Sequence, residues 1–363
     1  MKKLIPKYIY NLQPYQSAGR IGLKGGIQLN ANESPWNNTI QCKHNHLNRY
    51  PEFQPYKLLQ LYSQYSGVSI NQILITRGAD EGIELLVKAF CNPIHDKVMF
   101  FQPTYDMYSV VSNIFNIRVV NIPLFSNFQL NLPEIQKNIN DVKLIFFCNP
   151  NNPTGNLISK KDIIKIFSII TKNTLIVIDE AYIEYSIKNS FLIALKKSNN
   201  LVILRTLSKA FGLASLRCGF VISNINIINI LKKVIAPYPI ATPVSEIAIN
   251  ALSFKNIERV KNNIIKIKKN KKFLIKNLSF YSFIQFIFKS QTNFLLIKFF
   301  QSRKVFEHII SHGIIIRDQS HKSGLKDCLR ISVGTMKECR ELLTVLSLFK
   351  GKKIYNEKKI FIH

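Results

Sequence analysis

The sequence predicts an α/β protein with a large domain on a mostly parallel seven-stranded sheet and a smaller α+β domain. Short apolar segments of strand length alternate with helical patterns from about Ile73 onward, and such alternation is typical of a parallel sheet. From about Ile225 the alternation gives way to long helical stretches, and strand-like segments return only later. The change of pattern indicates a second domain near the C-terminal end.

The domain boundaries follow from these patterns and from a length of 363 residues, which favours more than one core. We expect an N-terminal arm and part of the small domain in residues 1–30, the large domain in 31–245 and the small domain in 246–363. The basic, weakly patterned tail Gly351–His363 is expected to fray.

The predicted strands share short apolar runs. In the large domain they are Ile73–Thr76, Lys97–Phe101, Arg118–Ile122, Lys143–Cys148, Leu175–Asp179, Leu201–Arg205 and Gly219–Ile222. Helical patterns between them cover Asp80–Phe90, Tyr105–Phe115, Ser159–Ile170 and Ser190–Lys196, and the later strands are Phe294–Lys298 and Cys328–Val333. Because ligands bind at the carboxyl ends of strands in such sheets, the residues that follow each strand are candidate site residues.

The formal charge of +29 invites a nucleic-acid-binding interpretation. The excess is mostly lysine spread along the chain, with one dense cluster at Lys266, Lys268, Lys269, Lys271, Lys272 and Lys276. Val260, Ile264, Ile267 and Leu274 keep a helical spacing through this cluster, which predicts that the lysines form the solvated side of an amphipathic helix. No stacking aromatic residues accompany them, and we expect no nucleic-acid partner.

The apolar runs, cysteines and histidines argue against a membrane protein, a secreted disulfide-rich protein and a metalloprotein. No apolar run approaches the ~18 residues of a membrane span, and Pro6 and Lys7 interrupt any signal-peptide core. The six cysteines lie far apart without a C-x-x-C pair, which favours reduced thiols in the cytoplasm. His308 and His312 would share a helix face, but no third ligand is evident, and no metal is expected.

A lysine follows one buried strand, in the segment Leu204-Arg205-Thr206-Leu207-Ser208-Lys209. Burying an amine is costly unless it has a function, and a Schiff-base lysine is one such function because desolvation keeps it nucleophilic. Ser208 and Arg217 flank Lys209 with a hydroxyl and a guanidinium, which suit a phosphate. Taken alone, a Ser-Lys pair is common and more typical of an exposed loop lysine.

Another candidate strand, Leu175–Asp179, ends in an acid. Asp179 follows four apolar residues, where an unpaired carboxylate is unfavourable. The cofactor pyridoxal 5′-phosphate (PLP) needs an acid beside its ring nitrogen, since the protonated pyridinium withdraws electrons from the substrate. Tyr182, three residues later, can reach the cofactor's phenolic oxygen.

Two further strand ends carry polar turns. In Cys148-Asn149-Pro150-Asn151-Asn152-Pro153-Thr154-Gly155, Asn152 is a candidate donor to the same phenolic oxygen, although composition alone indicates an ordinary proline-rich turn. In Thr76-Arg77-Gly78-Ala79-Asp80, glycine and the free amides of the following helix favour a phosphate. We interpret the Asp80 side chain as an N-cap.

These motifs resemble the fold-type I, class I/II aminotransferases over nearly the entire chain. Four more segments carry the resemblance: Leu29–Glu33, Arg49–Pro51, Pro103–Tyr105 and Cys328–Gly334. Each motif is weak alone, but together and in this order they identify the superfamily. Within it, the chain is similar to the members that act on L-histidinol phosphate in histidine biosynthesis.

The resemblance implies a fold-type I PLP-dependent transferase and a role for each motif residue. Lys209 would form the Schiff base and shuttle the proton between substrate and cofactor carbons. Asp179 would pair with the pyridinium, Asn152 and Tyr182 would hold the phenolic oxygen, and Tyr105 would stack on the ring. The residues that would hold the cofactor phosphate are Ala79, Asp80, Ser208, Arg217 and, from the partner subunit of a homodimer, Tyr50.

The resemblance also implies substrate-side residues, which are Tyr15, Asn152, Arg317 and Arg330. Two arginines suit a phosphate-bearing amine that alternates with glutamate and 2-oxoglutarate, because guanidinium groups bind phosphate and carboxylate bidentately. The same arginines would serve an aromatic-amino-acid aminotransferase or a phosphoamino-acid decarboxylase, so these alternatives stay open. A DNA-binding regulator with this fold is not expected, because only about thirty residues precede the core motifs. Ser215 and Asp106 depart mildly from the family pattern.

Overall fold

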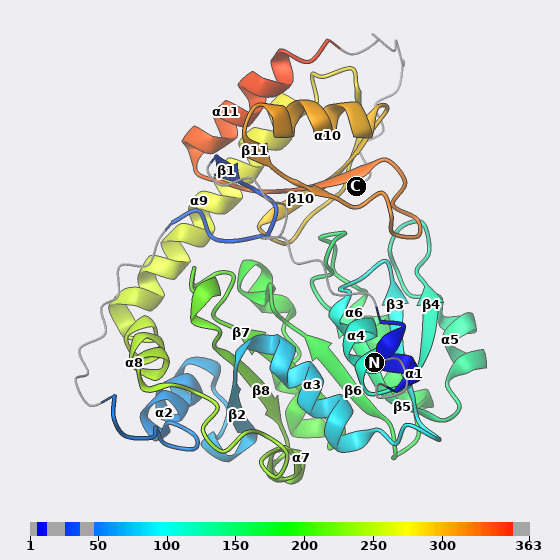
Figure 1. The fold of residues 1–363 in the computed structure, drawn as a ribbon, viewed down its shortest axis with the longest axis vertical. Coiled ribbons are helices and arrows are strands. Elements are labelled where there is room, and N and C mark those ends of the chain that lie inside the picture. The colour runs from blue at the N-terminus through cyan, green and yellow to red at the C-terminus, as the bar shows by residue number, and fades with distance from the viewer. Residues whose placement is uncertain (1–5, 13–25, 37–46, 351–363) are drawn as a thin grey trace.

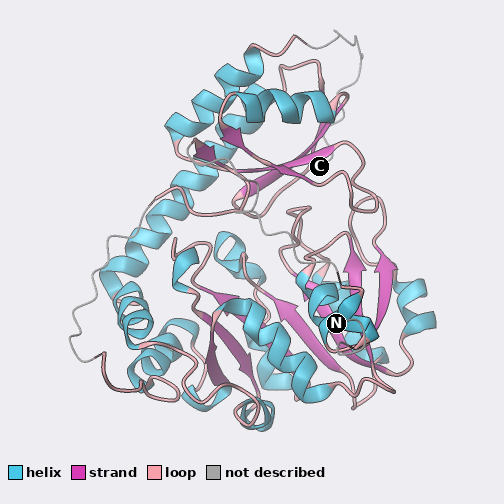
Figure 2. Cartoon of the chain, in the orientation of Figure 1, coloured by secondary structure: helices cyan, strands magenta, loops and turns pink. Residues whose placement is uncertain are grey.

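The computed structural model describes residues 6–12, 26–36 and 47–350. Strands form two separate groups (Figure 2), and the chain colours in Figure 1 show that the lower, larger group runs from the blue and cyan into the green part of the chain. The larger group is a seven-stranded sheet in the order β2-β8-β7-β6-β5-β3-β4. Its strands are β2 Ile73–Thr76, β3 Lys97–Gln102, β4 Arg118–Pro123, β5 Val142–Cys148, β6 Leu175–Asp179, β7 Leu201–Thr206 and β8 Gly219–Ser223. Six of the seven strands are parallel, and β8 is antiparallel to both neighbours, so the predicted fold class is confirmed.

The helices around this sheet follow the predicted alternation. They are α2 Tyr56–Ser66, α3 Gly78–Phe90, α4 Met107–Ile114, α5 Leu132–Asn138, α6 Lys160–Ile169 and α7 Ile225–Leu231, with α1 Lys7–Tyr10 near the N-terminus and α8 Thr242–Ala251 beside α2. Short 3-10 helices lie at Ile70–Gln72, Ile183–Asn189, Leu192–Lys197 and Ala214–Leu216. The predicted helix Ser190–Lys196 is therefore a 3-10 segment, Leu192–Lys197, with Ser190 and Phe191 outside it.

Both faces of the large sheet are buried, which explains the uninterrupted apolar runs of its strands. On β6, Val177 faces a core shared with α3, α4 and α7, whereas Ile176 and Ile178 face a core shared with α2, α5 and α6. Period-2 alternation along the strand thus sends successive side chains into two cores. Because both faces of the sheet are covered, a binding site can form at the carboxyl ends of the strands, where polar residues follow.

The smaller part packs helices against a four-stranded antiparallel sheet in the order β12-β13-β10-β9. Its elements are β9 Ile284–Ile287, β10 Phe294–Phe299, α10 Ser302–Ser311, β11 Ile314–Ile315, β12 Arg317–Asp318, β13 Cys328–Ser332 and α11 Met336–Ser347. The long helix α9, Phe254–Leu278, runs from the side of α8 up to this part (Figure 1). The N-terminal strand β1, Ile27–Gln28, pairs with β11 in parallel, so the start of the chain joins the smaller part.

The lysine cluster lies on α9, as the helical spacing predicts, but not all of it is solvated. Lys266, Lys268 and Lys269 are exposed, whereas Lys271 is part-buried and its ammonium donates to the carbonyls of Ser290 and Thr292 at 2.7 and 2.8 Å. Burial lowers the pKa of Lys271 to about 8. The expectation of a purely solvated lysine face was wrong at this position, because a loop distant in sequence packs there.

Helix α3 begins at Gly78, two residues earlier than predicted, and this changes the interpretation of Asp80. The residue before its first turn is Arg77, and Asp80 lies inside that turn. The Asp80 carboxylate instead accepts a hydrogen bond from the Tyr105 hydroxyl and pairs with Arg217. The N-cap interpretation was wrong, since the partners of Asp80 come from other strand ends. Among the described helices, none is long and apolar enough to cross a membrane.

Candidate active site

A cavity lies between the carboxyl ends of the large-sheet strands and the smaller part. Of the predicted site residues, it is lined by Ala79, Asp80, Tyr105, Asn152, Asp179, Tyr182, Ser208, Lys209, Arg217, Arg317 and Arg330. Tyr15 lies outside the described residues. Tyr50 is 81% exposed and lines a different hollow, where its ring stacks on Tyr238 with centroids 4.5 Å apart.

Lys209 reaches the cavity from the loop after β7. Its ammonium donates to the Ala31 carbonyl at 2.9 Å and lies 5.8 Å from the centre of the Tyr182 ring. Burial, with the positive charge of Arg330 added, lowers the pKa of Lys209 from its usual 10.5 to about 8. An amine with this pKa is neutral in roughly a tenth of molecules at pH 7, far more than an ordinary lysine amine, and a nucleophilic or proton-transferring lysine acts in that neutral form.

Asp179, at the last position of β6, is a buried acid. It is 2% exposed, and its carboxylate accepts hydrogen bonds from the Tyr108 hydroxyl at 2.8 Å and from the Ala181 amide at 3.0 Å. Burial raises its pKa from 3.8 to about 6, although both hydrogen bonds lower it. The oriented carboxylate in a low-dielectric wall suits a cationic ring nitrogen.

A buried salt bridge next to Asp179 connects its strand β6 to the neighbouring strand β7. Glu180 and Arg205 form a salt bridge at 2.8 Å with side chains 0% and 2% exposed, and Glu180 also accepts from Ser190 Oγ at 2.9 Å. A buried pair with additional hydrogen bonds is satisfied in place. It links β6 and β7, the two strands that carry Asp179 and Lys209.

A small anion cradle lies where α3 begins. Gly78 has a φ of +79°, which other residues rarely adopt, and a Cβ there would meet Arg217 Nη2 at 2.7 Å, so another residue would strain the backbone and displace the guanidinium. Arg217 pairs with Asp80 at 3.0 Å and its Nη1 donates to Ser208 Oγ at 3.4 Å. Thr206, which the sequence analysis did not assign, hydrogen-bonds to Ser208 at 2.9 Å. Hydroxyls, a guanidinium and free helix amides together fit a phosphate.

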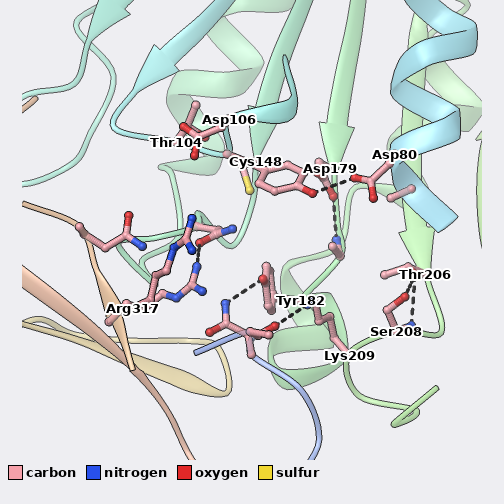
Figure 3. Close-up of a pocket in the computed structure, with 18 of the residues that line it drawn as sticks. Asp80, Thr104, Asp106, Cys148, Asp179, Tyr182, Thr206, Ser208, Lys209 and Arg317 are labelled. Atoms are coloured by element: carbon pink, nitrogen blue, oxygen red, sulfur yellow. Dashed lines mark hydrogen bonds between the residues drawn. The ribbon is translucent and has the colours of Figure 1, made fainter. Parts of the chain in front are cut away.

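Opposite the cradle, two arginines and an asparagine meet. Arg330 Nη1 donates to Asn152 Oδ1 and Arg330 Nη2 to the Asn30 carbonyl, both at 2.6 Å. Arg317 is the cross-strand register partner of Arg330. Figure 3 shows Arg317 and Ser208 at opposite ends of the view, with Tyr182 and Lys209 between them.

Tyrosine hydroxyls join the walls of the cavity. Tyr182 accepts a hydrogen bond from Asn32 Nδ2 at 3.0 Å, and Tyr105 donates to Asp80 at 2.8 Å. Burial raises the pKa of Tyr182 above its ordinary value, so the Tyr182 hydroxyl stays protonated. Asn32 stands in a segment that sequence analysis singled out without giving it this role.

Sequence analysis also missed part of the wall. Further lining residues are Thr104, Asp106, Cys148, Gln319, His321 and Lys322. Three of them come from the loop between β12 and β13, which has no motif beyond Arg317. No group of three or more His, Cys, Asp or Glu that could hold a metal occurs among the described residues.

The donor set of this cavity fits PLP. The buried Asp179 supplies the acid for a pyridinium, Lys209 supplies an amine with a lowered pKa, and the cradle at Gly78 supplies donors for a phosphate. These three groups lie in one cavity, as the separate ends of one cofactor molecule require.

Comparisons with known proteins agree with this chemistry. Residues 27–346 match the family "aminotransferase class I and II". A histidinol-phosphate aminotransferase of Buchnera aphidicola subsp. Cinara cedri is 63% identical over 352 residues, which cover 97% of this chain and 100% of that protein. Another from Buchnera aphidicola subsp. Schizaphis graminum is 48% identical over 350 residues, covering 96% of this chain and 99% of that protein.

Solved structures share the fold. The histidinol-phosphate aminotransferase from Clostridium acetobutylicum superposes with a TM-score of 0.79 at 26% identity, covering 88% of this chain and 98% of that chain. The enzyme from Sinorhizobium meliloti in complex with pyridoxal-5′-phosphate superposes with a TM-score of 0.82 at 21% identity, covering 95% and 98% of the two chains.

Proposed function

The chain belongs to the class I and II aminotransferase family, and we propose that it transfers an amino group between L-histidinol phosphate and 2-oxoglutarate, with PLP as cofactor, in histidine biosynthesis. The observation that carries the proposal is that Arg317 and Arg330, register partners on adjacent antiparallel strands, line the same cavity as Lys209 and Asp179. The 63% identical relative supports the substrate assignment over nearly the whole chain.

The cofactor supplies an electron sink for the bond changes at the substrate carbon, and residues of this chain hold and tune it. Asp179 keeps the ring nitrogen protonated, because a carboxylate in a buried wall favours a cation beside it. Tyr182 and Asn152 would hold the phenolic oxygen, since both line the cavity. The residues assigned to the phosphate are Ala79, Asp80, Ser208 and Arg217, and Tyr105 is assigned to the ring face.

Lys209 carries the proton between the two carbon atoms that exchange it. Its pKa of about 8 supports this role, since an amine accepts and returns a proton readily only when its pKa is near the working pH. Tyr182 and the Ala31 carbonyl bound the space in which the Lys209 amine moves, and burial excludes competing water.

The substrate side is assigned to Arg317, Arg330 and Asn152, together with Tyr15. The two guanidinium groups serve phosphate and carboxylate in turn, because both anions accept bidentate hydrogen bonds. Arg330 is held by Asn152 and by the Asn30 carbonyl, so its position is fixed before a ligand binds. This supports a preorganised anion site.

The proposal includes a homodimer in which Tyr50 reaches the partner's cofactor phosphate. Tyr50 and Tyr238 form an exposed stacked pair at a hollow away from the chain's own cavity, and large exposed aromatics are typical of interfaces. A mixture of Tyr50→Ala and Lys209→Ala chains tests it. Hybrid dimers regain one complete site if Tyr50 acts across subunits, whereas a mixture as inactive as its components contradicts the exchange.

We also propose that the enzyme works in the cytoplasm and that residues 1–30, 31–245 and 246–363 are its arm, large domain and small domain. Cys91, Cys148, Cys218, Cys328 and Cys339 are free thiols, which supports a reducing compartment. The pairing of β1 with β11 supports the assignment of the arm to the small domain.

The function is tested with the purified holoenzyme, L-histidinol phosphate and 2-oxoglutarate. Glutamate should form in step with loss of histidinol phosphate, and no carbon dioxide should be released. Phenylalanine and phosphothreonine replace the amino donor in parallel assays, because the open alternatives are an aromatic aminotransferase and a phosphoamino-acid decarboxylase. Turnover that favours either of these, or carbon dioxide release, would contradict the proposal.

A further inference from the structure

One wall of the cavity is built by residues 317–322, here called the rim segment. Arg317, Gln319, His321 and Lys322 of this segment line the cavity. Its backbone is held at two points, where the Gln319 amide donates to the Cys328 carbonyl at 3.0 Å and the Lys322 amide donates to the Gln319 carbonyl at 3.0 Å. Gln319 therefore has a defined backbone position beside the two arginines.

The rim segment is also tied to the large sheet. The Lys322 ammonium donates to the Thr104 carbonyl at 2.9 Å and forms an ion pair with Asp106, both in the loop between β3 and α4. Asp106 is one of the two departures from the family pattern, and here it has a partner. The contacts of Lys322 thus connect the smaller part to the large sheet at the edge of the cavity and help to fix the position of the rim segment, which includes Gln319.

The Gln319 side chain carries an unsatisfied polar atom. It is 3% exposed, and its Oε1 is buried without a hydrogen-bond partner in the part of the chain that the structure describes. A buried acceptor left without a donor is costly, and such groups in native proteins call for an explanation. The terminal torsion of glutamine is soft, so the amide can turn toward a ligand while the backbone stays fixed.

We propose that Gln319 is a specificity-determining residue whose side-chain oxygen accepts a hydrogen bond from the imidazole N–H of the amino donor. The inference rests on the proposed function. The phosphate of L-histidinol phosphate and both carboxylates of glutamate offer only hydrogen-bond acceptors. The amine of histidinol phosphate is engaged in the reaction at Lys209. The ring N–H is the donor that remains for Gln319.

The charges around Gln319 favour a neutral ring. Arg317, Arg330 and Lys322 line the same cavity, and their positive charges disfavour an imidazolium beside them. A neutral carboxamide can accept from a neutral imidazole without adding charge. Glutamate presents no side-chain donor, so Gln319 distinguishes the two amines that share the arginines.

The test replaces Gln319 with Met, which keeps length and removes the acceptor, and with Leu as a second variant. Each holoenzyme is assayed with L-histidinol phosphate, with L-phenylalaninol phosphate and with glutamate. Phenylalaninol phosphate has the same amine and phosphate but no ring N–H. Ser323→Ala, an exposed change in the same loop, is the matched control. For histidinol phosphate, kcat/KM should fall about tenfold, because the ring donor loses its buried acceptor, and should stay within about twofold for the other two amines.

A measurement on the wild type alone covers the case in which neither variant folds. Histidinol phosphates methylated on either ring nitrogen have no ring N–H in the neutral form, so both should bind to the wild type about tenfold more weakly than histidinol phosphate. Equal losses of kcat/KM on both phosphorylated amines, no loss on either, or methylated derivatives that bind as tightly as histidinol phosphate would overturn the inference. A wild-type enzyme that does not use histidinol phosphate at all would instead contradict the proposed function.

Discussion

Arg317 and Arg330 are direct register partners across the antiparallel strands β12 and β13, and both line the cavity that holds Lys209. Like charges directly opposite one another on neighbouring strands are destabilising. An anion bound in front of the two guanidinium groups would offset this repulsion. Arg330 is the more buried of the two and is held by Asn152 and Asn30.

This difference predicts unequal effects of the two arginines on specificity. Arg317→Ala should reduce kcat/KM for histidinol phosphate about tenfold or more relative to phenylalanine, because a charged contact to phosphate contributes about 1.5–3 kcal/mol. Arg330→Ala should impair both amines and glutamate, since the carboxylate uses the same guanidinium. Equal losses on phosphorylated and unphosphorylated amines for Arg317→Ala would reject phosphate recognition at that residue.

Tyr108 is predicted to matter although it does not line the cavity. Its hydroxyl donates to Asp179 at 2.8 Å, and a hydrogen bond to a carboxylate contributes about 1.5–3 kcal/mol. Tyr108→Phe should lower kcat about tenfold or more while the cofactor stays covalently bound. Tyr281→Phe, which removes a 2.8 Å bond to the Leu343 carbonyl far from the site, is the control. Equal turnover of the two variants would show that Tyr108 has only a packing role.

Asp179→Asn should retain the cofactor and lose most transamination, because a neutral amide no longer favours a protonated ring nitrogen. The cofactor-free protein should show the opposite effect on stability. The folded-state pKa of Asp179 is raised from 3.8 to about 6, so the folded wild type binds more protons than the unfolded chain between these pH values. Its stability should therefore fall by about 2 kcal/mol as pH rises from 4 to 7.

Urea unfolding of the cofactor-free wild type and Asp179→Asn from pH 4 to 8 measures this difference. Glu184, whose pKa burial raises to about 7, titrates in the same range but is common to both proteins and cancels. The gap in unfolding free energy should widen in favour of the variant as pH rises through 6. A gap that is constant with pH would mean that Asp179 does not bear the raised pKa.

The strand positions were readable from the sequence, and the contacts between strand ends were not. Leu175–Asp179 was predicted to the residue because four apolar residues lead to an acid, a pattern that a fully buried parallel strand imposes. The partners of Asp80 are Tyr105 and Arg217, which lie on other strand ends. A single sequence carries no signal for those pairings.

The same limit explains the residues that sequence analysis missed. In the sequence, Tyr108 has the pattern of a core residue of a helix. Only the packing of that helix, α4, near the end of β6 brings the Tyr108 hydroxyl to Asp179. Lys271 has the same helical environment in sequence as its exposed neighbours, and the loop at Ser290 selects it. Lys209 and Asp179 were found because their chemistry conflicts with their apolar surroundings, a signal that is local in sequence.

The buried pair behind the site makes a prediction on stability. Glu180→Gln should lower the free energy of unfolding by about 3 kcal/mol or more, because Arg205, 2% exposed, keeps a buried charge without its carboxylate. Glu307→Gln breaks an exposed pair with Arg303, whose side chains are 58% and 90% exposed, and should cost less than about 1 kcal/mol. Urea denaturation of both variants makes the comparison, and equal costs would contradict the account of the buried pair.

The most direct test of the central claim is the amino-donor half-reaction of the holoenzyme, followed by the absorbance of the cofactor. L-histidinol phosphate, phenylalanine and aspartate are each mixed with enzyme in the absence of 2-oxoglutarate, and borohydride treatment of wild type and Lys209→Ala identifies the lysine bound to the cofactor. The account predicts the fastest conversion at the lowest concentration with histidinol phosphate, and covalent cofactor on the Lys209 peptide of the wild type alone. Faster conversion with aspartate or phenylalanine, or covalent cofactor on another lysine, would contradict it.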